Sequence, residues 1–362
     1  MICLKCKYLE NKLNDVKIEQ PKNIRVADYQ LTDNVKEVIK IEKGYVTYAV
    51  VNSKTNKIYI AYPNFILAVD CNTMNVVARI DMGELARIYR LEQKELVVNE
   101  AINKIYAISG GKIHVINGDT NKLDTILEHR YHANYIAVNP ISNSLYISYR
   151  DADSVVVYDC TTDSKIVEAR VKTPAGVAID SISNKIYVAN SDPTKDLNTI
   201  SIIDGTSNEI NDSIVFPTEK SGLLSGAWQH LDKRALINES NRLLYIIGSL
   251  TRSGGGAGGT VNVLFVVDIE KRHLVNKHYL GSDICLAVNQ YNNSIYLRDA
   301  EKNTILKLDE CARKVIESVE VIKMGFWRRV FSARQEALVF NPITHKVYQT
   351  DGRYGLLYVL DS

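Results

Sequence analysis

The sequence contains no run of about 18 apolar residues, so it predicts no membrane-spanning helix. Its first residues lack the continuous apolar stretch of a secretory signal, and we therefore expect a cytoplasmic protein. No charge of one sign dominates either, since 44 Lys and Arg residues face 42 Asp and Glu residues. Overall charge thus selects neither a nucleic acid nor any other polyanionic partner, and a basic patch has to be argued locally.

Cysteine is too sparse for a disulfide framework, with six residues scattered over 362. Cys3 and Cys6 form a single C-x-x-C motif, but no second pair follows at the spacing of a zinc site. The sequence therefore predicts no structural metal. The remaining four lie in or beside strand-like segments, where we expect buried or half-buried thiols: Cys71, Cys160, Cys285 and Cys311.

A short motif recurs seven times between residue 45 and the C-terminus. Each copy has Asn or Asp at the end of an apolar segment and a Tyr seven residues later, and most copies have a second Asn between them. The clearest copy runs from Asp180 through Asn184 to Tyr187. The recurring tyrosines are Tyr59, Tyr106, Tyr146, Tyr187, Tyr245, Tyr296 and Tyr348.

The spacing within the motif predicts a strand, a tight turn and a second strand. Asn and Asp bond to the backbone two residues further on, and Asn tolerates the left-handed conformation that a reversal requires. The Tyr alternates with aliphatic residues, which places the ring and its neighbours on opposite faces of a sheet. Because the same residues recur in every copy, we interpret them as structural.

A third and a fourth apolar segment follow each motif, at an overall repeat of roughly 40–58 residues. Four antiparallel strands repeated in this way predict an all-β protein, a seven-bladed β-propeller with four-stranded blades. The last blade has only three strands, and the segment from Val35 to Ile41 is predicted to complete it and close the ring. A segment at 23–28 competes for that place. We therefore expect an N-terminal arm at 1–34 and a single propeller at 35–362.

The chain resembles the YVTN-repeat β-propeller family. The stretch from Asn184 to Asn190 and the later Ile203-Asp204-Gly205 are close to the consensus unit of that family, and the resemblance covers residues 45–361. It implies a seven-bladed propeller similar to those of streptogramin lyases and quinoprotein dehydrogenases. Proteins of the family are often secreted or on the cell surface, whereas this chain lacks a visible signal. The motif identifies blades and carries no catalytic residue.

The copies differ mainly in their loops. In such a blade the connections between the second and third strands, and those between blades, share one face of the ring. All the long insertions belong to that face: 190–198, 217–233, 249–260 and 322–335. Because binding residues concentrate on loops held by a rigid scaffold, we predict that this face and the channel mouth bind a partner.

These insertions are rich in Arg and aromatic residues, which suit anionic or stacked ligands. We predict a non-catalytic binding propeller with no cofactor, expected to be a monomer, that takes a protein or a small anionic ligand. The predicted ligand-binding residues are Trp228, His230, Arg234, Trp327, Arg328 and Arg334.

Two alternatives stay open. The first is an enzyme, such as a lyase with a divalent metal held by His132 and His230 near the channel. The second is a nucleic-acid-binding propeller that uses the same Arg and aromatic residues. The sequence names no catalytic residue for the first alternative, so whether the chain is an enzyme is left undecided.

Overall fold

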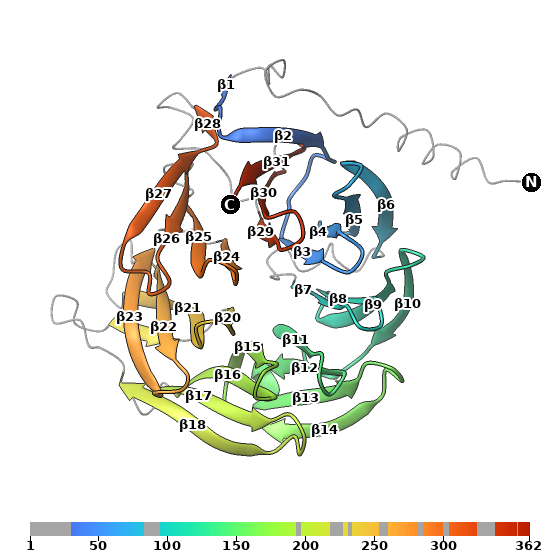
Figure 1. The fold of residues 1–362 in the computed structure, drawn as a ribbon. Helices are drawn as coiled ribbons and strands as arrows, with labels where there is room; N and C mark the ends of the chain where they lie inside the picture. Colours follow the sequence, from blue (N-terminus) through green and yellow to red (C-terminus); the bar gives the residue numbers. More distant parts are fainter. Residues whose placement is uncertain are drawn as a thin grey trace, which may run out of the picture.

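The computed structural model describes residues 30–82, 95–192, 197–217, 227–230, 234–252, 260–280, 285–299, 304–323, 337–352 and 354–362. Within these residues the strands form seven antiparallel blades of four strands around a central axis (Figure 1). The predicted fold class is thus confirmed. The competing segment at 23–28 and the Cys3/Cys6 pair lie outside the described residues.

Each of the first six blades runs from an innermost strand at the axis to an outermost strand at the rim, in chain order. Blades 1 to 3 comprise β3 (Tyr48–Asn52), β4 (Lys57–Ala61), β5 (Phe65–Asp70), β6 (Asn75–Asp81); β7 (Leu96–Asn99), β8 (Lys104–Ser109), β9 (Lys112–Asn117), β10 (Lys122–Leu127); and β11 (Tyr135–Asn139), β12 (Ser144–Tyr149), β13 (Ser154–Asp159), β14 (Lys165–Arg170). Blades 4 to 6 comprise β15 (Pro174–Asp180), β16 (Lys185–Asp192), β17 (Leu197–Asp204), β18 (Ile210–Pro217); β20 (Ala235–Asn238), β21 (Leu243–Arg252), β22 (Thr260–Asp268), β23 (His273–Leu280); and β24 (Leu286–Asn289), β25 (Ser294–Asp299), β26 (Thr304–Leu308), β27 (Val315–Glu320).

Blade 7 joins the two ends of the chain. It contains β29 (Leu338–Asn341), β30 (Lys346–Asp351) and β31 (Leu356–Asp361), and its outermost strand is β2 (Val35–Lys40), which pairs antiparallel with β31. The predicted closure by an N-terminal strand is confirmed, and Figure 1 shows β2 outside β31. Just before it, β1 (Gln30–Leu31) pairs with β28 (Ile322–Lys323). The end of the predicted arm therefore pairs with the segment that follows blade 6.

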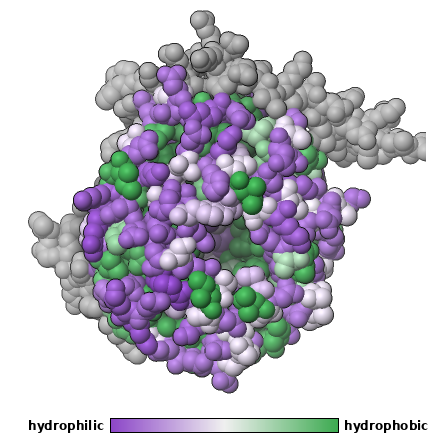
Figure 2. Space-filling view, in the orientation of Figure 1, coloured by the Kyte–Doolittle hydropathy of each residue, from purple (hydrophilic) through white to green (hydrophobic). Residues whose placement is uncertain are grey.

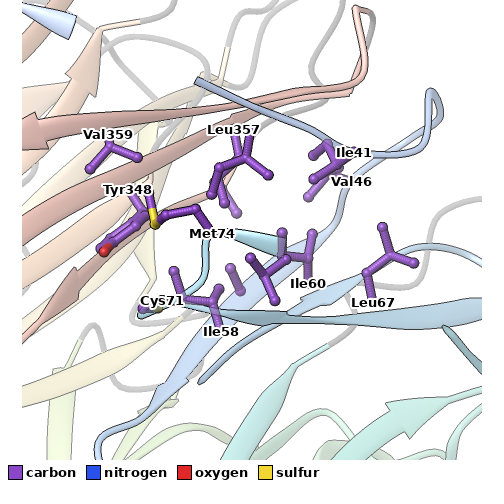
Figure 3. Packing of buried hydrophobic residues seen from close by; sticks show 14 of the residues in the cluster. Ile41, Val46, Ile58, Ile60, Leu67, Cys71, Met74, Tyr348, Leu357 and Val359 are labelled. Atoms are coloured by element: carbon purple, nitrogen blue, oxygen red, sulfur yellow. The ribbon is translucent and has the colours of Figure 1, made fainter. Parts of the chain in front are cut away.

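The hydrophobic core is divided among the joints between blades. The buried apolar residues form seven clusters, one at each joint. At the joint of blades 7 and 1, Ile58 and Ile60 pack with Tyr348 and Leu357 (Figure 3). Tyr59 lies between these two isoleucines in sequence but packs in the cluster shared with blade 2. The predicted alternation of ring and aliphatic side chains is confirmed.

The connections divide between two faces of the ring. We call the turn face the one that carries the turns from first to second and from third to fourth strand. We call the loop face the one that carries the second-to-third connections and the junctions between blades. Two of the long loop-face insertions are partly strand, since β16 and β17 pair as far as Asp192 and Leu197, and β21 and β22 as far as Thr251 and Thr260. A further strand, β19 (Ala227–His230), pairs with the extended end of β21.

The recurring Asn residues stabilise their own turns as predicted. In the second copy, the side-chain oxygen of Asn99 accepts a hydrogen bond from the backbone N–H of Ala101, two residues further on, at 3.2 Å. Asn56 has a φ of 50°, in the left-handed region. The equivalent residues of the other copies have φ values between 50° and 60°, even where the residue is Arg242 or His345. The turn geometry is therefore common to all seven blades.

The same residues also join neighbouring blades, a role that the local pattern did not predict. In most joints the first Asn donates from Nδ2 to the side-chain oxygen of the left-handed Asn in the next blade. These bonds are Asn52 to Asn103 at 2.7 Å, Asn99 to Asn143 at 2.6 Å, Asn139 to Asn184 at 2.7 Å, Asn238 to Asn293 at 3.0 Å and Asn341 to Asn56 at 2.8 Å. The last of them joins blade 7 to blade 1. We call this series the Asn belt.

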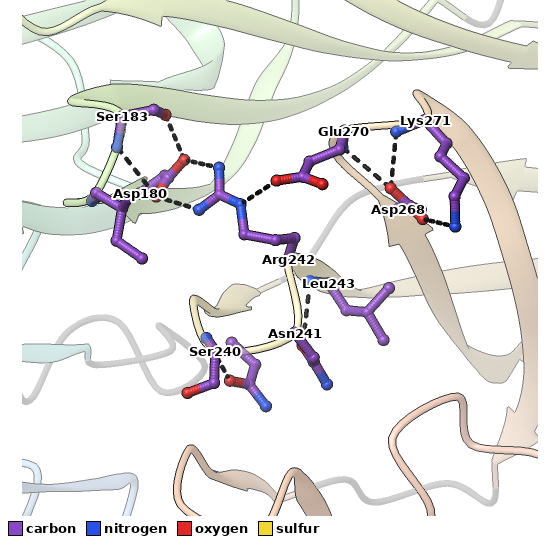
Figure 4. Close-up of polar contacts among 11 residues, drawn as sticks. Asp180, Ser183, Ser240, Asn241, Arg242, Leu243, Asp268, Glu270 and Lys271 are labelled. Carbon is purple, nitrogen blue, oxygen red and sulfur yellow. Dashed lines mark hydrogen bonds and ion pairs between the residues drawn. The ribbon is translucent and has the colours of Figure 1, made fainter.

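The joint of blades 4 and 5 replaces the amide pair by an ion pair. Asp180 stands in the first position and Arg242 in the second, and Arg242 donates to the two carboxylate oxygens at 2.7 and 2.6 Å (Figure 4). The Asp180 side chain is fully buried, whereas that of Arg242 is 21% exposed. The two departures from the repeat therefore compensate each other across one joint.

Candidate functional site

The centre of the propeller is lined by the seven innermost strands. Each of them contacts the innermost strands of both neighbouring blades, which closes a ring around the axis. The space-filling view shows a hollow at the centre of this ring (Figure 2). Side chains that begin these strands lie at the loop-face end of the channel, because the chain enters each innermost strand from a blade junction.

One position of the repeat marks this end of the channel. It lies eleven residues before each recurring Tyr. In six blades it stands directly before or at the start of the innermost strand, and in blade 4 it is the third residue of β15. Unlike the Tyr, this position differs strongly between copies. We call the seven residues the channel ring: Tyr48, Glu95, Tyr135, Gly176, Arg234, Cys285 and Ala337.

Backbone hydrogen bonds fix the channel ring to the blades. The carbonyls of Glu95 and Arg234 accept from the second-strand N–H groups of Ile108 and Ile247 at 3.0 and 2.9 Å. The carbonyls of Cys285 and Ala337 accept equivalent bonds. A side chain at this position therefore starts from a rigid element, which is a favourable basis for a binding site.

Arg234 reaches across the channel. It belongs to blade 5, yet its guanidinium lies over the ring of Tyr48 in blade 1, 4.3 Å from the ring centroid. Its Nε is 3.8 Å from Oε1 of Glu95 in blade 2. In a ring of seven blades, blades 1 and 2 are the two farthest from blade 5. The side chain thus spans the hollow and meets the opposite wall by a cation–π contact and an ion pair.

Glu95 is a buried acid on that wall. Its side chain is only 9% exposed, and Oε2 accepts a hydrogen bond from the backbone N–H of Ile136 at 2.9 Å. Burial raises the pKa of Glu95 to about 7, against the opposing effects of Arg234 and the Ile136 N–H. The carboxyl is therefore able to change its charge near neutral pH.

Tyr48 remains a neutral phenol. Burial raises its pKa, and the positive charge of Arg234 only partly opposes this effect. The carboxyl of Glu95 and the thiol of Cys285 add to the increase in the pKa of Tyr48. The result is one basic, one acidic and one aromatic group, from blades 5, 2 and 1, around a common space.

The guanidinium of Arg234 forms no hydrogen bond with the described residues around it. Its Nε is buried and forms no hydrogen bond with any residue that the structure describes. Its contacts with described residues are the 3.8 Å ion pair and the face of Tyr48, and neither is a hydrogen bond from the fork of N–H donors. Such a fork matches the two oxygens of a carboxylate or phosphate group.

Of the six residues predicted to bind a ligand, only Arg234 has a described side chain. Trp228 and His230 lie in β19, so their backbone belongs to the sheet of blade 5, but the placement of their side chains is not described. Trp327, Arg328 and Arg334 lie outside the described residues. The prediction for these five residues stays a prediction.

Sequence reasoning missed Glu95 and Tyr48. Both lie in ordinary strand entries, away from the long insertions that directed attention to the loop face. A signal was present nonetheless, because counting back eleven residues from each recurring Tyr finds both of them together with Arg234. Comparing the copies position by position would have identified the channel ring.

The histidines of the metal alternative lie on different blades. The imidazole of His132 lies close to Gly111 in blade 2, so closely that a Cβ on this glycine would be 1.9 Å from Nδ1. His230 belongs to the sheet of blade 5. Among the described residues, no three His, Cys, Asp or Glu side chains gather as metal ligands. A metal site that uses His132 and His230 stays a prediction.

No helix within the described part of the chain is long and apolar enough to cross a bilayer. The four cysteines predicted to be buried or half-buried are so, with Cys71 and Cys160 buried and Cys285 and Cys311 partly exposed.

Comparison with known proteins supports the fold of the chain and assigns it no family. No family model matches the chain, and no curated protein matches its sequence. Among solved structures, a chain of Kuenenia stuttgartiensis hydrazine synthase has a TM-score of 0.66 at 10% identity, covering 94% of this chain and 99% of the other. The Cps50 (Swd1) β-propeller domain of Myceliophteria thermophila has a TM-score of 0.61 at 11% identity, covering 92% and 99%. A chain of a mitotic checkpoint complex has a TM-score of 0.62 at 12% identity, covering 96% and 97%. At these identities the chain is shown to share the propeller fold with them.

Proposed function

We propose that this chain is a non-catalytic binding propeller that takes a small anionic ligand at the loop-face end of its channel. Arg234 is the main contact. The observation that carries the proposal is a guanidinium that spans the channel without a hydrogen bond to any described residue. An anion offered to such a fork gains charge-assisted hydrogen bonds, which are about twice as strong as neutral ones.

The surroundings of Arg234 support binding rather than catalysis. Tyr48 provides an apolar ring below the guanidinium, which holds its plane and keeps water from that side. The position varies between copies, whereas the residues that build the blades recur, as expected for a site placed on a repetitive scaffold.

A role in binding is also consistent with the propeller fold, which a chain of the mitotic checkpoint complex shares. For the finer relationship we propose the YVTN-repeat family, supported by the unit from Asn184 to Asn190. A protein partner on the loop face is compatible with a small ligand in the channel, because the two use different parts of the same face.

Isothermal titration with sulfate and acetate tests the anion site. These probes offer a tetrahedral dianion and a planar carboxylate to the same arginine. Arg234→Gln should weaken binding at least tenfold, because the charged fork is lost. Arg272→Gln is the matched control, since Arg272 is an exposed arginine paired with Asp212 on the turn face. Binding that is absent from the wild type, or equal in the wild type and Arg234→Gln, would overturn the proposal.

A further inference from the structure

We propose that an anion bound at Arg234 enters the channel together with one proton, which Glu95 takes up. This inference rests on the proposed function, because it concerns the same site. The site would then bind an anion and a proton together, so its affinity for the anion would depend on pH.

The geometry places two negative charges in competition for one guanidinium. Glu95 Oε1 is 3.8 Å from Nε of Arg234, close enough for attraction but too far for a hydrogen bond. A ligand that binds the remaining donors of Arg234 brings a second negative charge to the same end of the channel. Like charges that share a buried site raise the pKa of one of the two groups, because both cannot stay ionised at low cost.

Glu95 is the group that becomes protonated when the anion binds. Its side chain is nearly buried, so its ionised form lacks hydration and depends on Arg234 for a counter-charge. An anion that neutralises Arg234 removes this support. Protonation then leaves the hydrogen bond from Ile136 to Oε2 in place and gives Oε1 a proton. The protonated oxygen becomes a donor that faces the ligand, instead of a charge that repels it.

The other groups around Glu95 do not take this role. Arg234, from blade 5, stays charged throughout. Tyr48, from blade 1, keeps its proton because burial raises its pKa, and blade 3 contributes the backbone N–H of Ile136. Cys285, from blade 6, raises the pKa of Tyr48 electrostatically and packs against the apolar cluster between blades 6 and 7. Among these described groups, Glu95 is the carboxyl whose pKa, at about 7, lies in the working range.

The experiment measures binding and proton uptake together, with sulfate and acetate as probes because neither titrates between pH 6 and pH 9. Titrations at several pH values give the dissociation constant. Repeating them in two buffers of different ionisation enthalpy gives the number of protons taken up per anion. The uptake measurement requires no variant, so it does not depend on whether a mutant folds.

We expect the dissociation constant to rise about tenfold per pH unit above pH 7 and to level off below it. One proton should be taken up per anion at pH 8. Glu95→Gln mimics the protonated acid, so its affinity should be independent of pH and its binding should take up no proton. Wild-type binding that requires Arg234 but shows neither pH dependence nor uptake would refute the coupling and leave the anion site standing. No binding by wild type or Glu95→Gln at any pH would refute both.

Discussion

The ion pair between Asp180 and Arg242 gives the sharpest test of how the ring is held together. Each other described bond of the Asn belt joins two asparagines, so the double variant Asp180→Asn/Arg242→Asn rebuilds at this joint the pair found at its neighbours. In the single variants an amide faces a charged group. The single and double variants together form a double-mutant cycle on one joint.

The structure sets the size of the expected effects. Arg242→Asn leaves the fully buried Asp180 carboxylate without its counter-charge and without the two hydrogen bonds from Arg242, although the bond from Ser183 stays, which should lower the free energy of unfolding by about 3 kcal/mol. Asp180→Asn keeps a polar partner for a guanidinium that is partly exposed, so its loss should be about 1–2 kcal/mol. Glu270, the second partner of Arg242, is 64% exposed and contributes little. The double variant should return to within about 1 kcal/mol of the wild type, as expected for a pair that the fold already accepts.

The pair also predicts a response to acid. Burial opposes ionisation of Asp180, but the hydrogen bonds from Arg242 and Ser183 outweigh it and hold its pKa below the ordinary value. A lowered pKa in the folded state stabilises the protein above the pKa of the unfolded chain, and this contribution disappears as the pH falls through the folded-state pKa. The stability of the double variant should therefore fall less below pH 4 than that of the wild type.

Urea denaturation followed by circular dichroism measures the free energy of unfolding of the wild type, the two single variants and the double variant. The coupling energy between the two positions should be at least about 2 kcal/mol, because the double variant is expected to be more stable than either effect alone implies. Additive losses, with the double variant less stable than both single variants, would refute the interpretation of the two residues as one compensated joint.

The remaining predictions concern single side chains. Tyr245→Phe should lower the free energy of unfolding by about 1 kcal/mol, because its hydroxyl donates to the carbonyl of Glu310 at 2.8 Å. Tyr296→Phe should leave the free energy of unfolding unchanged or raise it, since the buried Tyr296 hydroxyl has no hydrogen-bond partner among the described residues. Thermal unfolding measures both variants, and an equal loss of stability in Tyr245→Phe and Tyr296→Phe would contradict this prediction. For Glu95 the folded-state pKa of about 7 lies above the unfolded value near 4.5, so the wild type loses stability as pH rises between them, up to about 3 kcal/mol. Glu95→Gln should not lose stability in this way. If the stability of wild type and Glu95→Gln, measured by urea denaturation, depends on pH in the same way, Glu95 does not have the raised pKa.

Much of the fold follows from local chemistry that the sequence displays. Asn56 and its equivalents adopt the left-handed conformation, and the motif around them makes a strand, a turn and a strand in each copy. The incomplete last copy predicted a strand borrowed from the N-terminal side, and β2 supplies it. The turn predictions hold because turn chemistry and alternation act over a few residues and repeat seven times, and the closure prediction holds because a four-stranded repeat with one strand missing requires that strand from elsewhere in the chain.

The candidate site was predicted in part. Arg234 was identified because it follows a long insertion, and its side chain extends into the channel. Glu95 and Tyr48 are found only by comparing the seven copies at one position, since a single Glu or Tyr at the start of a strand is unremarkable until its neighbours are known. Their chemistry depends on blade 5 facing blades 1 and 2, which local sequence does not express.

The sequence by itself determined the repeat and the turns, because these depend on interactions between residues close in the chain. It also determined the number of blades and the closure of the ring, because the motif can be counted and its last copy lacks one strand, although the strands that close the ring, β2 and β31, lie far apart in the chain. Only the tertiary structure decided that Asp180 and Arg242 form one joint and that Arg234, Glu95 and Tyr48 share one space. The physical reason is that closing seven blades into a ring brings the starts of distant strands together. Burial at that position then raises the pKa of Glu95, and the buried Nε of Arg234 is left without a hydrogen bond to any described residue.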